Sequence, residues 1–448
     1  MRTSLETLPR PRGLPLIGHM AAYLRNPLEF LVGTVRRHGD LVRLDFPRMP
    51  VVLTSNPDSI EQVLVTANRS FTKDNFTHDL SRLIGQGLLT SEGDHWRRER
   101  RLIQPAFHRE RINGYTRSMV SVTEQSIESW RDGAMRDIHE DLMKLTLGIV
   151  SNTLFSAEIG HDAEEVGESM EAVMMRFADP IAMALPKIDW LPLPSHRRFL
   201  AAEVRLDRVI RDIIRRRRAD PKEHDDLLGM LLAARDDDGS SMTDQQVRDE
   251  VITLFLAGHE TTALALSWTF YLLGRNPAAR ARLEDELREV LGGRAPTMAD
   301  LPKLPYTDAV ISETMRLYPP AWVMGRLAIA PFELQGHSFP AGVNVWFSQF
   351  VMHRDPRFFS DPERFAPERW LDGLAKRLPR FAYFPFGGGP RQCIGNVFAQ
   401  TEAMLLLATI AQKFRLHLDP DHVVEPATSI TLRPRNGVKA RVEMRRPS

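Results

Sequence analysis

Apolar residues recur at helical spacing over most of the chain, and this pattern predicts a mostly helical protein. The longest periodic stretch breaks near Asp132-Gly133, where a turn is expected. Pro319 and Pro320 stop another helix, because proline cannot continue one. The expected helices span residues 58–66, 92–107, 112–155 with that break, 164–184, 195–218, 284–291, 306–318 and 396–414, together with a long central helix that opens at Thr243 and contains residues 251–274.

Strand-like patterns are few and short, so the β portion is expected to be small. Residues 40–46 and 51–54 flank a proline-containing turn and predict a hairpin. Short strands are expected within residues 332–350. A second hairpin is expected within residues 430–444, turning near Asn436-Gly437.

One helix differs from the others because it is apolar on all sides. Between residues 251 and 274 the only charged residue is Glu260. A carboxylate at mid-bilayer costs about 2.5 kcal/mol or more, so a membrane span is disfavoured. A helix that is apolar all round can instead be the buried central helix of a large domain. Thr243 and Gln246 form the capping box that opens it.

Composition limits the function more than the fold. The net charge is +1, with 43% hydrophobic and 26% charged residues, so no global attraction to nucleic acid or membranes is implied. The run Arg215 to Arg218 closes a helix and is typical of an exposed helix end rather than a nucleic-acid patch. The first residues lack the apolar core of a signal peptide, and we expect no membrane anchor. The single cysteine excludes an internal disulfide and fits the cytoplasm.

That cysteine, Cys393, follows a glycine-rich loop and precedes the helix expected from Asn396. Free N–H groups and the macrodipole at a helix start favour a thiolate, which either attacks carbon or binds metal. A buried structural cysteine, a nucleophile and a phosphate-binding loop are alternatives. No local His or Asn signature accompanies a nucleophile, and the Lys-Ser/Thr ending of a phosphate loop is missing. The order of Phe, Gly, Arg and Cys fits the axial thiolate of a haem better.

The string from Phe386 to Gly395 resembles the haem-binding loop of the cytochrome P-450 superfamily of haem-thiolate monooxygenases. The family motif is Phe-x-x-Gly-x-Arg-x-Cys-x-Gly, and every fixed position matches. The resemblance implies haem b (iron protoporphyrin IX) with Cys393 as the iron's axial ligand, and dioxygen as co-substrate. It makes Arg391 a haem-propionate or docking-face residue. Phe386 would pack beside the sulfur, and Gly395 would leave room at the helix start.

A second motif, Ala257-Gly258-His259-Glu260-Thr261-Thr262, lies inside the central helix. A crossing of helices through small residues would explain the glycine and threonines, but it leaves a buried glutamate unexplained. The string is similar to the family's oxygen-activation motif. By that resemblance Gly258 makes room for dioxygen, Thr261 hydrogen-bonds the bound dioxygen, and Glu260 helps relay protons inward.

A third pattern is Glu313-Thr314-Met315-Arg316, which places a Glu and an Arg on one helix face. Such pairs are mostly exposed and contribute about 0.2–0.5 kcal/mol. In the family the pair is buried and joined by a further arginine. Arg364 and Arg369 both occur in Pro-Glu-Arg segments, and the spacing to the cysteine loop favours Arg369. Glu313, Arg316 and Arg369 are therefore interpreted as a structural network.

A fourth pattern is Trp96 with Arg100 one turn later. In its plainer interpretation, Trp96 is an interfacial tryptophan on an exposed basic helix. In the family a Trp-x-x-x-Arg motif binds a haem propionate through charge-assisted hydrogen bonds. Arg326 matches the position of another propionate-binding arginine. His95 is a further candidate for a propionate.

The substrate pocket implied by the resemblance is largely apolar. Residues 71–87 have no clear period and are predicted to be a long loop, of the kind that often binds ligands. Further walls are expected from residues 176–190, 254–261, 321–324 and 429–432. If the substrate is a fatty acid, Arg48 could hold its carboxylate. The candidate pocket residues are Phe76, Leu254, Ala257, Ala321, Trp322, Val323 and Ile430.

The matches run in order over residues 8–444. The resemblance therefore implies one haem domain over residues 1–448, mainly α with a minor β region around a long central helix. No reductase domain follows, so electrons are expected from a ferredoxin with its reductase or from a flavodoxin-type donor. Arg97, Arg98, Arg101 and Arg380 are candidates for a basic docking face, although a solvated helix face is the plainer interpretation. We expect a monomer.

The function implied is insertion of one atom of dioxygen into an apolar molecule such as a fatty acid, terpenoid, steroid or polyketide, by hydroxylation or epoxidation. A haem-thiolate peroxygenase or isomerase is one alternative, and a haem protein that binds ligands without oxidising them is another. The acid–alcohol pair Glu260-Thr261 argues against both, because neither needs a proton relay for dioxygen. A cysteine hydrolase is a more distant alternative.

Overall fold

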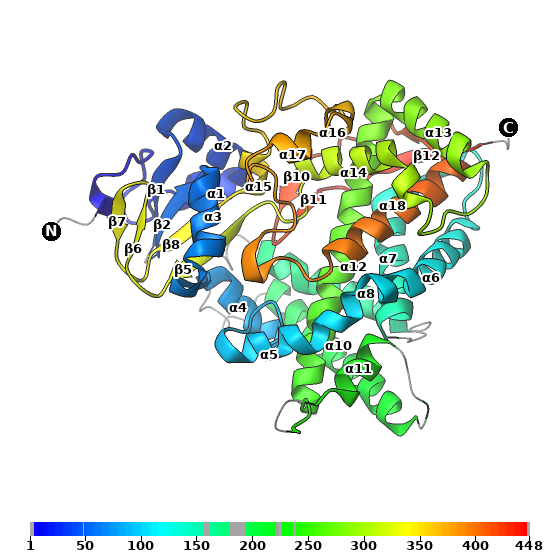
Figure 1. The fold of residues 1–448 in the computed structure, drawn as a ribbon, viewed down its shortest axis with the longest axis horizontal. Coiled ribbons are helices and arrows are strands. Elements are labelled where there is room, and N and C mark those ends of the chain that lie inside the picture. The colour runs from blue at the N-terminus through cyan, green and yellow to red at the C-terminus, as the bar shows by residue number, and fades with distance from the viewer. Residues whose placement is uncertain are drawn as a thin grey trace. The chain divides into compact units, whose positions relative to one another are not determined.

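Helices dominate the chain, as predicted, and short strands form a minor β part (Figure 1). The structure is a computed structural model that describes residues 4–47, 49–155, 162–178, 194–220, 222, 226–235 and 239–445. These residues group into two compact units, each built from three separate segments. The first unit holds Met1–Arg82, Met315–Arg364 and Gly373–Cys393, and the second holds Leu83–Thr314, Phe365–Asp372 and Ile394–Ser448. The single haem domain expected from the sequence stays a prediction.

A five-stranded sheet is the framework of the first unit. Its order is β1, β2, β8, β5, β3, in which β2 and β8 are parallel and the other pairs are antiparallel. The predicted hairpin is β1–β2. Val52, Val345 and Phe347 of this sheet lie in the unit's hydrophobic core, and burying such a side chain contributes about 1.5–3 kcal/mol. The strands are β1 Leu41–Phe46, β2 Met49–Thr54, β3 Phe71–Lys73, β5 Met324–Ala328 and β8 Asn344–Phe347, with a separate hairpin of β6 Phe332–Leu334 and β7 His337–Phe339.

Two helices of the first unit begin at an Asn-Pro pair. Asn26 accepts a hydrogen bond from the Glu29 N–H at 3.2 Å, and Asn56 accepts one from the Ser59 N–H at 3.0 Å. Both side chains satisfy donors that a helix start leaves free, and the following proline is preorganised for the first helical position. The helices of this unit are α1 Met20–Arg25, α2 Pro27–His38, α3 Pro57–Glu61 followed by a π-turn Gln62–Thr66, α15 Gln349–Met352 and α17 Leu374–Arg377, while α4 Asn75–Ile84 and α14 Pro305–Leu317 have residues in both units.

The second unit is built around α12, Asp244–Arg275, the predicted central helix. The capping box is present, because Thr243 Oγ1 accepts from the Gln246 N–H at 3.2 Å and Gln246 Oε1 accepts from the Thr243 N–H at 2.8 Å. α12 packs along α7, Ile138–Phe155 (Figure 1). The other helices are α5 Gly93–Ile103, α6 Arg109–Ile127, α8 Asp162–Ala178, α10 Pro194–Ala219, α11 Leu227–Ala233, α13 Pro277–Leu291, α16 Glu368–Leu371 and α18 Asn396–Lys413.

The strands of the second unit lie near the end of the chain, apart from one. β12 pairs on both sides with antiparallel neighbours, β4 and β9. β10 and β11 form a hairpin of their own. The strands are β4 Met135–Asp137, β9 Phe414–Leu418, β10 Pro426–Thr428, β11 Leu432–Pro434 and β12 Lys439–Met444.

Two predictions about the chain's path are wrong. Residues 71–87 are not one long loop, because they contain β3 and α4. Asp74 opens α4 by accepting from the Thr77 N–H at 3.0 Å and its hydroxyl at 2.6 Å. Residues 430–444 are not one hairpin either. The chain does turn at Gly437, where φ is +74°, but Val438 is tied to Asp137 and the next strand pairs with β4 and β9.

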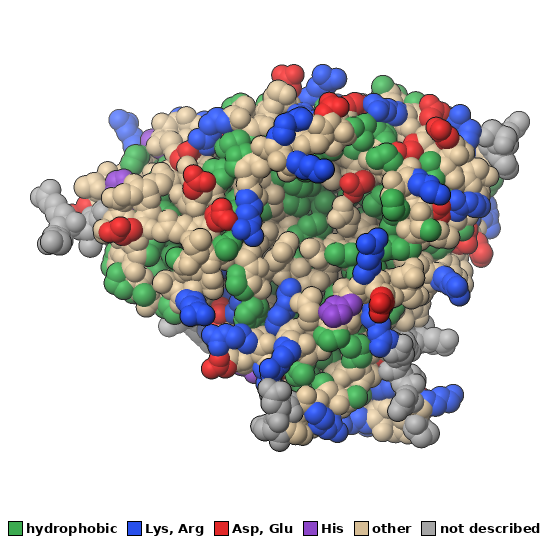
Figure 2. Space-filling model, viewed as in Figure 1, with side chains coloured by type: hydrophobic (Ala, Val, Ile, Leu, Met, Phe, Trp, Pro, Cys, Tyr) green, Lys and Arg blue, Asp and Glu red, His purple; other side chains and the backbone are tan. Residues whose placement is uncertain are grey.

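Most helix predictions are confirmed to within a turn at each end, and the break near Asp132 separates α6 from α7. α13 begins earlier than predicted, at Pro277, and residues 179–184 of another predicted helix lie outside the described residues. No helix in the described part of the chain is both long and apolar enough to cross a membrane. Acidic and basic side chains are interspersed on the face drawn in Figure 2, in keeping with the small net charge.

Candidate active site

The cysteine loop folds back on itself and presents its sulfur. The Cys393 N–H donates to the Phe386 carbonyl at 3.0 Å. Gly387 and Gly389 both have a φ of +69°, and a Cβ on Gly389 would lie 1.9 Å from the Leu64 carbonyl oxygen, so only glycine fits there. Cys393 itself is exposed. This exposure argues against a buried structural cysteine and suits a sulfur that binds a ligand.

Several residues of the oxygen-activation motif are accessible to solvent, whereas the residues around them on α12 are buried. Every residue from Val251 to Phe270 is buried, except Leu256, Ala257, Gly258 and Thr261. The Thr261 hydroxyl donates to the Ala257 carbonyl one turn earlier, at 2.7 Å. This opening, residues 256–258 and 261, presents apolar groups and one hydroxyl in a stretch of α12, residues 251–270, that is otherwise buried.

Gly258 has a packing role in this opening. A Cβ on Gly258 would lie 3.0 Å from Val150 of α7, tighter than ordinary contact. The glycine therefore allows α7 and α12 to approach closely. The room for dioxygen that the resemblance assigns to Gly258 stays a prediction.

Glu260 is buried and carries an ion pair that the sequence did not reveal. Its Oε1 accepts from Arg433 Nε at 2.7 Å and from the Thr431 hydroxyl at 2.8 Å. Both partners come from β11 and the residue preceding it, more than 170 positions away. A buried carboxylate needs such donors, because burying a charge without a partner is costly. The acid of the acid–alcohol pair is therefore positioned by Arg433 and Thr431.

A second buried acid joins α12 to α18. Glu402 is fully buried, and its Oε2 accepts from the Thr262 hydroxyl at 2.9 Å. Burial raises the pKa of Glu402 to about 8, and the hydrogen bond from Thr262 opposes that shift only in part. Glu402 is therefore mostly protonated at neutral pH.

Glu402→Gln is expected to flatten the decline in stability between pH 5 and pH 9. The folded-state pKa of Glu402 lies above the unfolded value of 4.5, so its contribution to stability is complete below that value and is lost as pH rises toward about 8. Each pKa unit corresponds to about 1.4 kcal/mol. Urea unfolding at several pH values measures the effect, with exposed Glu110→Gln as the matched control. Parallel pH curves for wild type and Glu402→Gln would contradict the assignment.

Known proteins of similar sequence identify the family of this chain. The family model described as "Cytochrome P450" matches residues 8–440 of this chain. The chain belongs to the cytochrome P-450 family. It is 42% identical over 429 residues to "Cyclooctatin synthase" of Streptomyces melanosporofaciens, which covers 94% of this chain and 92% of that protein.

Other similar proteins are also cytochromes P-450 or oxygenases. The chain is 39% identical to "Cyclooctat-9-en-7-ol 5-monooxygenase" of Streptomyces melanosporofaciens, covering 92% and 89% of the two chains. It is 36% identical to "Pentalenene oxygenase" of Streptomyces avermitilis, covering 98% and 97%. Among solved structures, "Retinoic acid bound cyanobacterial CYP120A1" superposes with a TM-score of 0.87 at 26% identity, covering 98% and 99%. The chain is therefore a haem-dependent monooxygenase that acts on an apolar substrate with dioxygen and electrons from redox partners.

The residues fit the haem-thiolate group that the family implies. Cys393 offers an exposed sulfur donor, and a Cβ on Gly388 or Gly389 would strike Phe381 or Leu64, so the loop reaches this position only with glycine. Arg391 is half-buried in the turn before the sulfur. A Cβ on Gly395 would lie 3.5 Å from Phe107, an ordinary contact, and the room that the resemblance assigns to Gly395 stays a prediction.

The predicted propionate residues lie on two elements. Trp96 and Arg100 are half-buried on α5, and Arg100 Nε donates to Gln104 at 2.9 Å. Arg326 is buried on β5 and donates to the Gly325 carbonyl at 2.8 Å. His95 has other neighbours: its Nε2 lies 3.2 Å from the Gln86 carbonyl and its Nδ1 lies 3.8 Å from Glu99.

The network on α14 is built from buried charges. Glu313 is fully buried and accepts from Arg369 Nε at 3.0 Å, Trp370 Nε1 at 2.9 Å and the Ala366 N–H at 2.9 Å. Arg369, rather than Arg364, is thus the arginine on Glu313. In the first unit, Arg316 is also fully buried and donates to three carbonyls, those of His353, Pro362 and Arg364.

The candidate pocket residues divide by burial. Phe76, Ala257, Ala321, Val323 and Ile430 keep accessible surface. Leu254 and Trp322 are 6% and 3% exposed and so offer a substrate almost no surface, which corrects that part of the prediction. The Trp322 carbonyl accepts from Ser348, which fixes its backbone in the core. Arg48 and residues 179–190 lie outside the described residues.

Proposed function

We propose that the chain hydroxylates or epoxidises a terpenoid, with haem b as its cofactor. The opening on α12 carries the proposal, because Leu256, Ala257 and Thr261 offer an apolar surface beside one hydroxyl. The names of three similar bacterial proteins support the substrate class: two denote oxygenases of the terpenoids cyclooctat-9-en-7-ol and pentalenene, and the third denotes a synthase of cyclooctatin. The single cysteine fits a cytoplasmic protein, and we further propose that it is a monomer.

The roles of the chain's own residues follow from their chemistry. Cys393 would hold the haem iron, and the guanidinium groups of Arg100 and Arg326 would bind propionates. When bound, the haem-thiolate group supplies the cleavage of the O–O bond. The Thr261 hydroxyl holds a proton beside the opening on α12, and the Glu260 carboxylate, oriented by Arg433, helps relay protons inward to replace it.

A spectral-shift titration tests the substrate class. Purified holoenzyme is titrated with cyclic terpenoids, and with fatty acids and steroids of similar size. Tight binding of a terpenoid, followed by an oxygenated product that requires a reductant and dioxygen, is the expected result. Turnover with peroxide alone would favour the peroxygenase. A response to fatty acids only would reject the terpenoid class.

Thr261→Ala is expected to lower product formed per reductant consumed. Alanine removes the only side-chain hydroxyl exposed between Val251 and Phe270 of α12. General acid–base groups contribute about 10²–10⁴-fold to rate. Thr261→Ser keeps the hydroxyl and serves as the matched control. Product and reductant consumption are measured together, and equal ratios for Thr261→Ala and wild type would contradict the role.

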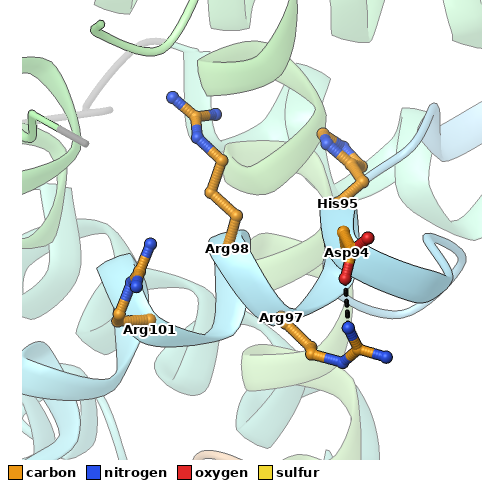
Figure 3. A pocket seen from close by; sticks show the side chains of 5 residues that line it. All are labelled: Asp94, His95, Arg97, Arg98 and Arg101. Carbon is orange, nitrogen blue, oxygen red and sulfur yellow. Dashed lines mark hydrogen bonds and ion pairs between the residues drawn. The ribbon is translucent and has the colours of Figure 1, made fainter. Parts of the chain in front are cut away.

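We propose that the redox partner is an acidic ferredoxin that docks on α5. Figure 3 shows Arg97, Arg98, Arg101 and His95 lining a concave surface there, with Asp94 on Arg97. Arg98 also forms an ion pair with Glu99, at 3.2 Å. A cluster of cations on one concave surface favours an acidic partner and speeds its association. In the first unit, Arg380 forms an ion pair with Glu61 at 2.8 Å and is therefore a weaker candidate for contact with the ferredoxin.

Arg101→Glu is therefore expected to slow electron transfer from an acidic ferredoxin. Reversing a charge in the docking surface should reduce the rate about tenfold at low salt, and the loss should shrink as salt screens the charges. Stopped-flow reduction measures the rate. Arg117→Glu, exposed on α6 outside this cluster, is the control. Equal rates for Arg101→Glu and wild type would reject the docking site.

A further inference from the structure

Two glutamates of the second unit, one on α5 and one on α12, are buried. Glu99 of α5 and Glu250 of α12 are 0% and 1% exposed, and each carboxyl group is among the side chains that act on the other. Among the described residues, no N–H or hydroxyl donor reaches Glu99 Oε2 or Glu250 Oε1. Two ionised carboxylates cannot form a hydrogen bond, because both are acceptors. A single proton carried by one of the two groups would give both of these buried oxygens a hydrogen-bond partner.

The surroundings decide which group carries it. Arg98 Nη1 donates to Glu99 Oε1 at 3.2 Å, and His95 Nδ1 lies 3.8 Å from the same oxygen, so both favour the charged form of Glu99. In the described part of the chain, the Leu88 N–H, at 3.0 Å, is the only hydrogen-bond donor to Glu250, which lies beside the acidic Asp249. Burial raises the pKa of Glu250 well above its usual range, the nearby Glu99 and Asp249 add to the shift, and the Leu88 hydrogen bond opposes it only in part. Burial also raises the pKa of Glu99. The proton is therefore assigned to Glu250 Oε1 and points to Glu99 Oε2.

The pair lies at the junction of three segments. Glu250 Oε2 accepts from Leu88, and Asp249 Oδ2 accepts from the Gln86 N–H at 2.9 Å. Gly85 and Gly87 allow this close approach, because a Cβ there would lie 2.1 Å from the Asp249 carboxylate or 2.3 Å from the Thr253 hydroxyl. Residues 85–88 are thus held on α12, and the shared proton holds α5 on the same helix.

We propose that Glu99 and Glu250 share one proton and are positioning residues for α5, the helix that carries Trp96 and Arg100. The link to these two residues rests on their proposed role as haem-propionate ligands. Neither glutamate touches substrate or cofactor in this proposal; they act through the placement of α5. Figure 3 shows Arg98 and His95 on this helix. Arg98 donates to Glu99, and the His95 ring lies 3.8 Å from the same carboxyl group.

The shared proton is expected to make the packing of α5 depend on pH. Because burial raises the pKa of both groups, the pair's contribution to stability is present below the unfolded value of 4.5 and is lost as pH rises through the folded-state pKa. Loss of the shared proton places two like charges in contact inside the protein. α5 is then expected to loosen from α12, and the haem to be released faster.

Infrared spectroscopy of the holoenzyme tests the shared proton directly. All variants are made on a Glu402→Gln background, because Glu402 is also protonated near neutral pH. The carbonyl stretch of a protonated carboxyl group is expected at pH 7 and should disappear in both Glu99→Gln and Glu250→Gln. In each variant the glutamine amide replaces the proton as donor, so the fold is retained. Persistence of the band in both variants overturns the proposal, and Glu110→Gln is the control.

The rate of haem transfer to a haem-scavenging protein tests the positioning role. On this background we expect the rate to rise about tenfold as pH passes the pair's titration, since one pKa unit corresponds to a factor of ten. The rate should stay level with pH in Glu99→Gln and Glu250→Gln. Equal pH profiles for these variants and their parent overturn the positioning role. The carbon-monoxide spectrum of the reduced protein, recorded in parallel, reports separately whether the proposed function fails.

Discussion

Replacing Cys393 with alanine is expected to abolish the thiolate-type absorption band of the reduced carbon-monoxide complex and to end turnover. The sulfur is exposed on a loop whose conformation needs glycine at positions 387 and 389. Alanine keeps that loop but removes the only sulfur that the sequence offers in this motif. Without the anionic donor, O–O cleavage loses its electronic push. The spectrum of the reduced, carbon-monoxide-treated protein measures the loss.

The matched control is Gln392→Ala, which changes the adjacent exposed side chain and leaves the sulfur in place. This variant should keep the thiolate-type band. Far-ultraviolet circular dichroism establishes that both variants remain folded. A normal band in Cys393→Ala would contradict the assignment of the ligand. Haem-free wild-type protein that hydrolyses esters would instead revive the cysteine hydrolase.

The cysteine loop could be predicted because its chemistry is local. Ten consecutive residues contain the glycines, the cation and the sulfur, so one stretch of sequence carries the whole pattern. The α12 motif was equally readable, and its exposed Ala257 and Thr261 match the residues singled out. What the sequence could not show was the partner of Glu260. Arg433 lies on a three-residue strand with no periodic signal, 173 positions away.

Burial decided the remaining differences. Asp249 and Glu250 read as the polar start of α12, yet both are buried, because residues 85–88 use them as acceptors. The residues next to Glu402 in the sequence do not indicate that its carboxyl group is protonated. Its state depends on being enclosed between α12 and α18, which is a property of the packing. Three-residue strands such as β3 escaped prediction for a related reason: they are defined by distant partners rather than by their own period.

Glu313→Ala in α14 is expected to cause a large loss of stability. The carboxylate accepts from Arg369, Trp370 and the Ala366 backbone, and it is fully buried. Removing it leaves a nearly buried guanidinium and two further donors without their acceptor. Breaking a buried ion pair from one side costs about 3–5 kcal/mol. Chemical denaturation monitored by tryptophan fluorescence and circular dichroism measures the change in free energy of unfolding.

Glu289→Ala on α13 provides the matched control, because it makes the same substitution on an exposed helix face. It should change stability by no more than about 0.5 kcal/mol. Glu313→Gln separates charge from hydrogen bonding, since the amide keeps one acceptor oxygen but loses the charge that faces Arg369. It should fall between wild type and Glu313→Ala. If Glu313→Ala and Glu289→Ala were equally stable, the buried network would contribute nothing, and the fold around α14 and α16 would have to be held by apolar packing alone.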